Sequence, residues 1–441
     1  MDKKNKPELL SPAGDFQKMK YALAFGADAT YAGIPKFSLR TRELEFNKDS
    51  LIKAIDYSHK LDKKLYLTMN IFAHNTKIDS FLKELDIVAE WNPDGIIMAD
   101  PGLINIAIKR YPKLTIHLST QANATNWTAV EFWRDMGVKR IVLSRELRLK
   151  EIEEIHKRVP DVELESFVHG AICIAYSGRC LITNYLNHRD ANQGTCTNSC
   201  RWEYKLSEED GSLTDIENHQ KTSFDKTTIP PDNLTVEEPQ RTGEKYPINE
   251  DQHGTYLFNA KDLCAVELLK EIHNAGVCSF KIEGRTKSAY YTAVTAMAYR
   301  NAIDDMWLEK PFNKKNLNDL MALSNRGYTT GFYTRNPREF GENYYDSRSK
   351  ELSHKIVGMP IDYDNQRNSL TFEIKNRLEK DTLVEVITPT ERHFVTANEI
   401  INPKGQLVDV AHGGTGFFSI PLEKDPGEFV VLRREIYASE K

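Results

Sequence analysis

Short apolar runs alternate with amphipathic segments through the first two thirds of the chain. The runs are rich in β-branched and aromatic residues and mostly end in polar ones, as the buried strands of a parallel sheet do. They lie at residues 7–14, 28–34, 64–72, 94–100, 114–121, 140–146, 163–171 and 279–285. The pattern predicts eight strands, of which the last is separated from the others by a long stretch of chain.

Apolar residues recur at helical spacing between these runs. Asp15, a residue type that often caps helices, precedes one such set at Phe16, Met19, Ala22 and Leu23. Strands and helices that alternate in this way predict a (β/α)8 barrel, a TIM-like fold, over residues 1–340. A doubly wound open sheet has the same alternation, and the number of strands does not decide between the two.

A small all-β domain is predicted to follow, at residues 350–441. Short alternating stretches at 370–376, 382–389, 392–400 and 428–435 are separated by Gly, Pro and Asn, which is typical of an antiparallel barrel or sandwich.

Polar residues at the carboxyl ends of the predicted strands are the candidates for a site, because the active sites of TIM-like barrels lie at that face. Those expected to bind substrate are Asn70, Gln121, Arg145 and Arg285. The catalytic residue remains unassigned, with His169, Lys281 and Glu283 as candidates. A polar residue at a strand end can also simply cap the next helix.

Four cysteines follow the seventh strand, inside an insertion that we place at residues 172–257. They are Cys173, Cys180, Cys196 and Cys200, spaced C-x6-C-x15-C-x3-C. Structural zinc prefers paired C-x2-C ligands, whereas iron–sulfur clusters accept wider spacing. The spacing therefore favours an iron–sulfur cluster and leaves zinc open. The polar, acidic second half of the insertion is expected to form a mobile loop or lid.

The two remaining cysteines, Cys264 and Cys278, are expected to be ordinary buried thiols, with Cys264 as a reserve ligand. A structural disulfide is disfavoured, because the chain begins without a secretory signal and has no apolar run that could cross a bilayer. We therefore expect a cytoplasmic protein with no membrane partner.

The net charge of −5 argues against general coating of nucleic acid but allows a local basic face. Basic residues gather in two stretches, at 139–150 and 281–287, and a solvated helix face would explain either of them equally well.

We call residues 173–200, which hold the four cysteines, the cysteine segment. It lies within "ESFVHGAICIAYSGRCLITNYLNHRDANQGTCTNSCRWEY", which closely resembles the signature region of the peptidase U32 family. The resemblance continues in "ELLSPAGDFQKMKYALAFGADATYAGI", "HLSTQANATN", "GTYLFNAKDL" and "FKIEGRTKSAYY", and so covers nearly the whole chain. Within the family the chain is most similar to the bacterial branch that hydroxylates tRNA. That branch makes 5-hydroxyuridine at wobble position 34, using prephenate and no molecular oxygen.

The resemblance implies a [4Fe–4S] cluster on Cys173, Cys180, Cys196 and Cys200. Some relatives lack the last cysteine and take a ligand from farther along the chain, so Cys264 stays a contender. It also implies that the tRNA anticodon stem-loop and prephenate are partners. The two carboxylates of prephenate suit the arginines, with Arg40 and Arg42 as further candidates, and the splayed base would stack on Tyr176, Tyr185 or Trp202. A paralogous subunit is a further partner that the sequence leaves open.

Two other functions are weighed against this one. The family name suggests a collagenase-like peptidase, for which His169 and Cys173 could form a dyad, but the chain has neither an H-E-x-x-H nor a G-x-S-x-G motif. The other alternative is an RNA-binding scaffold that is stabilised by zinc and has no catalytic activity.

Overall fold

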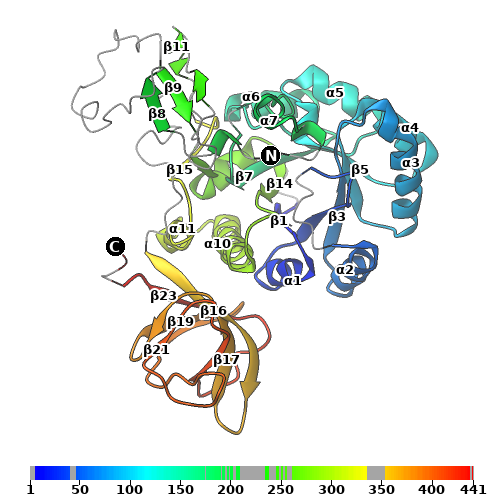
Figure 1. Ribbon diagram of the computed structural model, residues 1–441. Coiled ribbons are helices and arrows are strands. Elements are labelled where there is room, and N and C mark those ends of the chain that lie inside the picture. The colour runs from blue at the N-terminus through cyan, green and yellow to red at the C-terminus, as the bar shows by residue number, and fades with distance from the viewer. Residues whose placement is uncertain are drawn as a thin grey trace.

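Eight parallel strands close into a barrel at the centre of the molecule (Figure 1). The computed structural model describes residues 5–39, 46–173, 175–189, 191–193, 196–197, 199–201, 205–208, 234–237, 245–247, 250–251, 254–255, 261–334, 353–437 and 440. The barrel strands are β1 (Glu8–Pro12), β2 (Ala29–Gly33), β3 (Lys64–Met69), β4 (Gly95–Met98), β5 (Ile116–Leu118), β6 (Arg140–Val142), β7 (Glu163–Gly170) and β14 (Val277–Ile282). Because β14 pairs with both β1 and β7, the sheet is closed and the open alternative is excluded. The eight predicted strands and the barrel are confirmed.

Helices cover the outside of the barrel. They are α1 (Phe16–Ala24), α2 (Lys48–Lys60), α3 (Asn75–Glu90), α4 (Pro101–Arg110), α5 (Trp127–Met136), α6 (Leu149–Arg158), α9 (Leu269–Asn274) and α10 (Ala289–Trp307), and α11 (Lys314–Met321) packs against α10. The predicted cap is present, since the Asp15 carboxylate accepts a hydrogen bond from the Lys18 N–H at 2.7 Å. The main core fills the space between strands and helices.

The inside of the barrel is partly polar. Lys281 donates to Glu165 at 2.7 Å, and both side chains are almost completely buried. Arg140 forms ion pairs with Glu8, Glu163 and Glu165. Two residues that were counted in the basic stretches, Arg140 and Lys281, thus lie inside the barrel and cannot form part of an exposed basic face.

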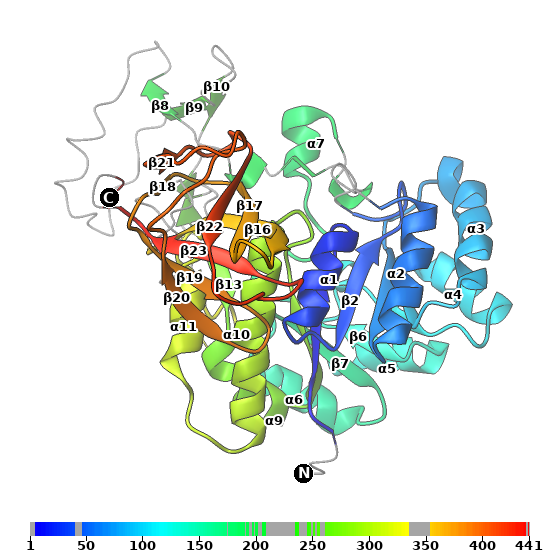
Figure 2. The same cartoon turned by 90° about the horizontal axis from the view of Figure 1, so that it is seen from below.

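The insertion leaves the barrel after β7 and returns to it before β14. Its described elements are α7 (Ile182–Asn187), three short 3-10 turns (Ala191–Gln193, Ser199–Arg201 and Val266–Leu268), and the strands β8 (Lys205–Glu208), β9 (Leu234–Glu237), β10 (Lys245–Pro247), β11 (Glu250–Asp251), β12 (Gly254–Thr255) and β13 (Asp262–Cys264). Strands β8, β9 and β10 form an antiparallel sheet that the sequence did not predict. Strand β13 pairs antiparallel with β7 and parallel with β15 (Tyr328–Thr329). Figure 2 shows α7 at the end of the barrel opposite the N-terminus of the chain.

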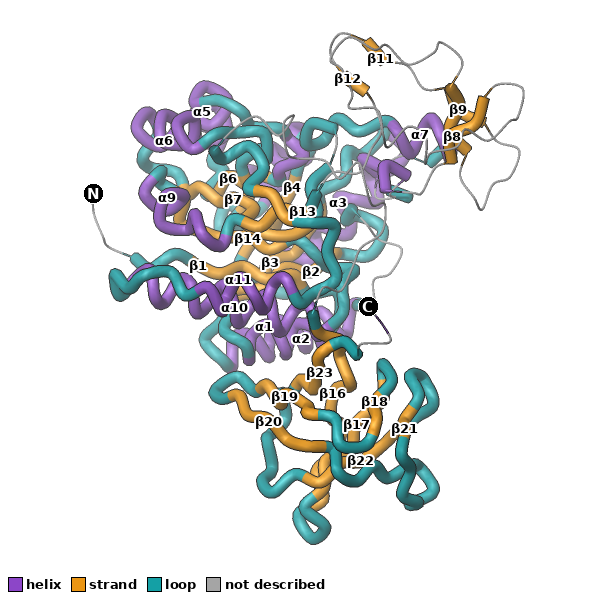
Figure 3. Tube along the Cα trace, turned by 90° about the vertical axis from the view of Figure 1, so that its left-hand side faces the viewer, coloured by secondary structure: helices purple, strands orange, loops and turns teal. Residues whose placement is uncertain are grey.

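The C-terminal domain is an antiparallel sheet in the order β20-β19-β23-β16-β17-β22, with a core of its own. Its strands are β16 (His354–Asp364), β17 (Ser369–Ile374), β19 (Leu383–Ile387), β20 (Arg392–Thr396), β22 (Phe417–Pro421) and β23 (Val431–Glu435), and β18 (Leu378–Glu379) pairs with β21 (Val410–Ala411). The predicted all-β character is confirmed. In Figures 1 and 3 the domain lies next to α10 and α11.

Buried ion pairs hold this domain against the barrel. Asp319 of α11 accepts hydrogen bonds from Arg392 and from Arg433, the latter at 2.8 Å, and Glu385 accepts from Arg433 at 2.6 Å. Ile387 and Val431 join the core of the barrel. Within the described part of the chain, no helix is both long and apolar enough to span a membrane.

Replacing Asp319 with alanine is expected to lower the free energy of unfolding by about 3 kcal/mol, since it leaves two buried guanidinium groups short of an acceptor. Asp305→Ala is the matched control, because Asp305 makes only a long, partly exposed contact with Lys310 at 3.9 Å. Urea unfolding of both variants measures the difference. Equal losses in the two variants would show that the Asp319 pairs do not hold the domain.

Candidate active site

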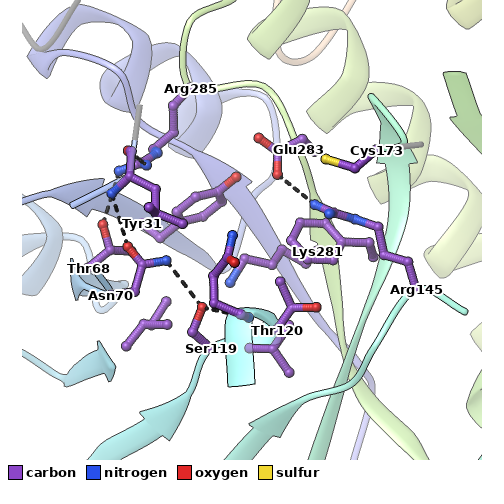
Figure 4. A pocket seen from close by; sticks show the side chains of 15 residues that line it. Tyr31, Thr68, Asn70, Ser119, Thr120, Arg145, Cys173, Lys281, Glu283 and Arg285 are labelled. Atoms are coloured by element: carbon purple, nitrogen blue, oxygen red, sulfur yellow. Dashed lines mark hydrogen bonds and ion pairs between the residues drawn. The ribbon is translucent and has the colours of Figure 1, made fainter. Parts of the chain in front are cut away.

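A pocket opens at the carboxyl ends of the barrel strands (Figure 4). Its space, including the part that is open to solvent, is about 550 Å³. Of the predicted site residues, the pocket brings together Asn70, Gln121, Arg145, Cys173, Lys281, Glu283 and Arg285. Tyr31, Thr68 and Phe167 also line it and were missed. Tyr31 and Phe167 could have been found from the strand alternation, which turns every second side chain into the barrel.

Arg285 is held rigidly on one side of the pocket. Its guanidinium donates to the hydroxyls of Ser38 (2.8 Å) and Thr68 (3.0 Å) and to the carbonyl of Leu39. These three oxygens hold the guanidinium in one orientation at the wall of the pocket. Gly33 makes room for it, because a Cβ there would lie 2.4 Å from Nη1 of Arg285.

Arg145 stands on the other side of the pocket and is paired with a carboxylate. Its Nη2 lies 3.0 Å from Glu283 Oε2, and its guanidinium lies over the ring of Phe167, 4.0 Å from the centroid. The Glu283 backbone is also fixed, since its carbonyl accepts a hydrogen bond from the Tyr291 hydroxyl at 2.8 Å. Cys173 lines the same pocket (Figure 4).

Amide side chains form the wall of the pocket between these two arginines. Asn70 accepts from the Leu39 N–H (3.2 Å) and donates to the Ser119 hydroxyl (3.1 Å), so its orientation is set. Gln121 contributes a buried Oε1 atom that has no hydrogen-bond partner among the described residues. The wall can therefore accept a hydrogen bond from a ligand.

Lys281 lies at the floor of the pocket. Its ammonium lies over the ring of Tyr31, 4.5 Å from the centroid, and donates to Glu165. Burial lowers the pKa of Lys281, although the Glu165 carboxylate opposes this effect. The Lys281 ammonium is thus already paired with a carboxylate inside the barrel.

His169 lies outside the pocket, in contrast to the other candidates for catalysis. The pairing of β7 with β14 has an irregularity between Phe167 and His169, which breaks the alternation and turns His169 toward the helices. Its Nδ1 lies 3.3 Å from the Tyr299 hydroxyl, and its ring packs near Tyr291 and Tyr328. Burial, with a smaller effect of the Lys287 charge, lowers the pKa of His169 to about 3. This position argues against His169 as the acid–base residue.

The four predicted ligand cysteines are reduced and form no disulfide with one another. Cys173 is exposed and Cys180, Cys196 and Cys200 are half-buried. Burial raises the pKa of Cys180 and the nearby Cys173 and Cys196 raise it further, whereas hydrogen bonds from the Ile182 and Thr183 backbone oppose the shift. Among the residues that the structure describes, no group of three or more His, Cys, Asp or Glu side chains is arranged to hold a single metal ion.

The other two cysteines belong to the barrel. Cys264 of β13 is buried in the core, and burial raises the pKa of its thiol to about 11. Its sulfur accepts a hydrogen bond from Tyr299 at 3.9 Å. Cys278 of β14 donates to the Leu164 carbonyl at 3.4 Å. The expectation of two buried thiols agrees with these positions for Cys264 and, more loosely, for the half-buried Cys278.

The fold and the pocket define the class of protein: a TIM-like barrel with a polar pocket and a cysteine-bearing insertion, followed by a small β domain. The model of peptidase family U32 matches residues 14–343, and that of the peptidase family U32 C-terminal domain matches residues 353–433. The chain therefore belongs to peptidase family U32, as its motifs predicted.

Named relatives and a solved structure are similar to the chain. It is 45% identical to tRNA hydroxylation protein P of Escherichia coli (strain K12), over 95% of this chain and 94% of the relative. It is 29% identical to the 23S rRNA 5-hydroxycytidine C2501 synthase of the same organism, over 80% of this chain and 48% of the relative. The solved structure of the U32 peptidase Mk0906 is 18% identical and covers 39% of this chain and 72% of its own, with a TM-score of 0.34.

The buried His169 predicts a pH-dependent loss of stability. Its folded pKa lies below the value of about 6.5 in an unfolded chain, so its contribution is complete above that pH and falls as the pH drops toward 3. Between pH 7 and pH 5 the wild type is expected to lose about 2 kcal/mol more unfolding free energy than His169→Gln. Urea unfolding at the two pH values measures this difference.

The exposed His412 provides the control. His412→Gln should keep the loss seen in the wild type. If His169→Gln keeps it as well, then His169 is not held neutral in the folded protein.

Proposed function

We propose that this chain is a tRNA-modifying enzyme that hydroxylates C5 of wobble uridine 34 without molecular oxygen. In this proposal prephenate is the cosubstrate, a [4Fe–4S] cluster is the cofactor and the cytoplasm is the compartment. The observation that carries the proposal is the pocket in which two arginines and a lysine meet Cys173 of the cysteine segment. The names of the two similar Escherichia coli proteins, which act on RNA, support the class of reaction.

The two arginines suit the two carboxylates of prephenate. A guanidinium binds a carboxylate through two parallel hydrogen bonds, which fixes both position and orientation. Arg285 would bind the first carboxylate, since it lines the pocket and the Ser38 and Thr68 hydroxyls fix the orientation of its guanidinium. Arg145 would bind the second after partial exchange with Glu283, whose carboxylate lines the pocket and would accept a proton. Arg40 and Arg42, also predicted as ligands, lie outside the described residues.

The cysteine segment fits a cluster better than a single ion. Cys173 and Cys196 lie near enough to Cys180 to affect its pKa, and the C-x6-C-x15-C-x3-C spacing contains no C-x2-C pair. Cluster ligands stand around a larger body than one zinc ion, which suits this arrangement. The Thr183 hydroxyl contacts Cys196 at 3.9 Å, as hydrogen-bond donors near cluster sulfurs do. Converting C5–H into C5–OH removes two electrons from the base and adds one oxygen atom; in this proposal water would supply the oxygen, prephenate would be the net electron acceptor, and a bound cluster would supply redox chemistry.

The tRNA base would enter from the side of the cysteine segment. Tyr176 on this segment is 60% exposed and is free to stack on a splayed base. The side chains of Tyr185 and Trp202 lie outside the described residues. Arg148 and Lys150 are exposed just beyond the carboxyl end of β6, at the mouth of the barrel, and can contact phosphates there. Lys139 lies at the opposite end of β6, so the basic stretch is divided between the two ends of the barrel.

The alternatives receive less support from the geometry. His169 bonds Tyr299 and is turned away from the pocket that Cys173 lines, so a His169–Cys173 dyad for peptide cleavage is not assembled. Structural zinc prefers paired C-x2-C ligands, and the spacing of the four cysteines contains no such pair. In addition, a scaffold without catalytic activity does not require a pocket lined by several charged side chains.

Anaerobically purified protein is expected to carry about four irons and four sulfides per chain, with a brown colour. Cys196→Ser should lose most of the iron. Cys278→Ser is the control and should keep it, because Cys278 lies in β14, outside the cysteine segment. Absorption spectra and analysis of iron, sulfide and zinc in the wild type and the two variants measure the metal content. One zinc per chain, or equal iron in both variants, would contradict the assignment of the cysteines.

Arg285→Lys is expected to weaken prephenate binding roughly tenfold to a hundredfold, because lysine keeps the charge but loses the planar fork. Anaerobic titration calorimetry measures the Kd. Arg158→Lys, a change in a surface arginine that pairs with Glu154, is the control and should bind as the wild type does. An unchanged Kd for Arg285→Lys would remove Arg285 from the binding site.

A further inference from the structure

A carboxylate at the end of β6 fastens the cysteine segment to the barrel. Glu146 accepts a hydrogen bond from the Ser177 N–H at 3.0 Å, and the Ser177 hydroxyl lies 3.4 Å from each carboxylate oxygen. The Ser144 hydroxyl donates to the same carboxylate from the barrel side. Ser177 is only 3% exposed, so water competes little for these bonds.

The next residue of the segment is fastened by close packing. Gly178 has a φ of +74°, and a Cβ there would lie 2.0 Å from the carbonyl oxygen of Gln121. Only glycine allows the two backbones to come so close in this conformation. Gln121 belongs to the 3-10 helix η2 (Thr120–Ala122) after β5, so the segment is fastened to two neighbouring strand ends.

The fastened residues lie between the first two cysteines and next to the pocket. Cys173 precedes Ser177 and Gly178 along the chain, and Cys180 follows them. Gln121, against which Gly178 packs, lines the pocket together with Cys173. Arg145, which precedes Glu146 in the sequence, also lines it.

A contact on the far side shows that the segment spans the mouth of the barrel. The Phe72 N–H, just beyond β3, donates to the Asn192 carbonyl at 3.2 Å, and the Asn192 side chain donates to the Cys180 carbonyl at 3.2 Å. The segment is thus attached on the β5–β6 side and on the β3 side. Its position over the pocket is set by these contacts as well as by its covalent ends.

We propose that Glu146 is a positioning residue that fixes the Cys173–Cys180 stretch over the pocket. Glu146 does not itself line the pocket, so its effect on the reaction passes through Ser177. The inference rests on the proposed function in that the cysteine segment takes part in the reaction. The fastening can be measured independently of that reaction.

The test compares Glu146→Ala with Glu151→Ala in the full-length holoprotein. Glu151 is the matched control, because its carboxylate also accepts a backbone N–H in the same stretch of chain, that of Arg148 at 2.8 Å, without touching the cysteine segment. Hydrogen exchange followed by mass spectrometry reports the mobility of residues 173–181. The 5-hydroxyuridine content of tRNA, from a strain that lacks the gene and is complemented with each variant, reports the reaction.

Glu146→Ala is expected to speed exchange in this stretch roughly tenfold to a hundredfold, as removal of a hydrogen bond to a charged group does. It should also lower 5-hydroxyuridine, while exchange in the barrel strands stays unchanged. Glu146→Gln keeps an acceptor oxygen for the Ser177 N–H and should restore part of both effects. Glu151→Ala should change neither the hydrogen exchange at residues 173–181 nor the 5-hydroxyuridine content of tRNA.

Two results would overturn the inference: unchanged exchange at residues 173–181 in Glu146→Ala, or faster exchange with full 5-hydroxyuridine. A wild type that restores no 5-hydroxyuridine would instead reject the proposed function, and the exchange measurement would still decide whether Glu146 fastens the segment.

Discussion

The pairing of β14 with both β1 and β7 is the constraint on which the rest of the structure depends. Through it, Lys281, Glu283 and Arg285 near the end of the barrel sequence meet Asn70 and Gln121 from its first half. The insertion leaves at the carboxyl end of β7, and β13, at its far end, pairs with that same end of β7, so the insertion begins and closes at the face that holds the pocket. An open sheet would separate these groups, and the pocket would not exist.

Closure also accounts for the charges inside the barrel. Lys281 and Arg140 are buried together with Glu165 and Glu8, and each cation has a carboxylate within hydrogen-bonding distance. Such buried pairs contribute little net stability but cost several kcal/mol when one partner is removed. The floor of the pocket is therefore rigid, and a ligand meets Lys281 in a fixed place. The Arg285 guanidinium is held in place by hydrogen bonds to the Ser38 and Thr68 hydroxyls.

The sequence predicted the eight strands, the all-β C-terminal region and the charged and amide side chains of the pocket, since strand periodicity and strand-end polarity follow from burial alone. It could not predict that His169 turns outward, because the irregularity in β7 depends on pairing with a strand far along the chain. The burial of Arg140 and Lys281 was missed for a similar reason, as their acceptors come from distant strands. Strand β16 was missed because Gly358 and Pro360 interrupt its pattern where its pairing shifts. Glu146 was also missed, since its partner Ser177 lies 31 residues farther along the chain, beyond β7.

The central claim is that the pocket and the cysteine segment together hydroxylate tRNA without oxygen. The most direct measurement incubates anaerobically purified protein with an unmodified tRNA transcript, with and without prephenate, under strict exclusion of oxygen. Mass spectrometry then locates modified nucleosides. The account predicts 5-hydroxyuridine at position 34 only when prephenate is present. Its absence in protein that carries a full complement of iron and sulfide, or its formation only after oxygen is admitted, would contradict the account.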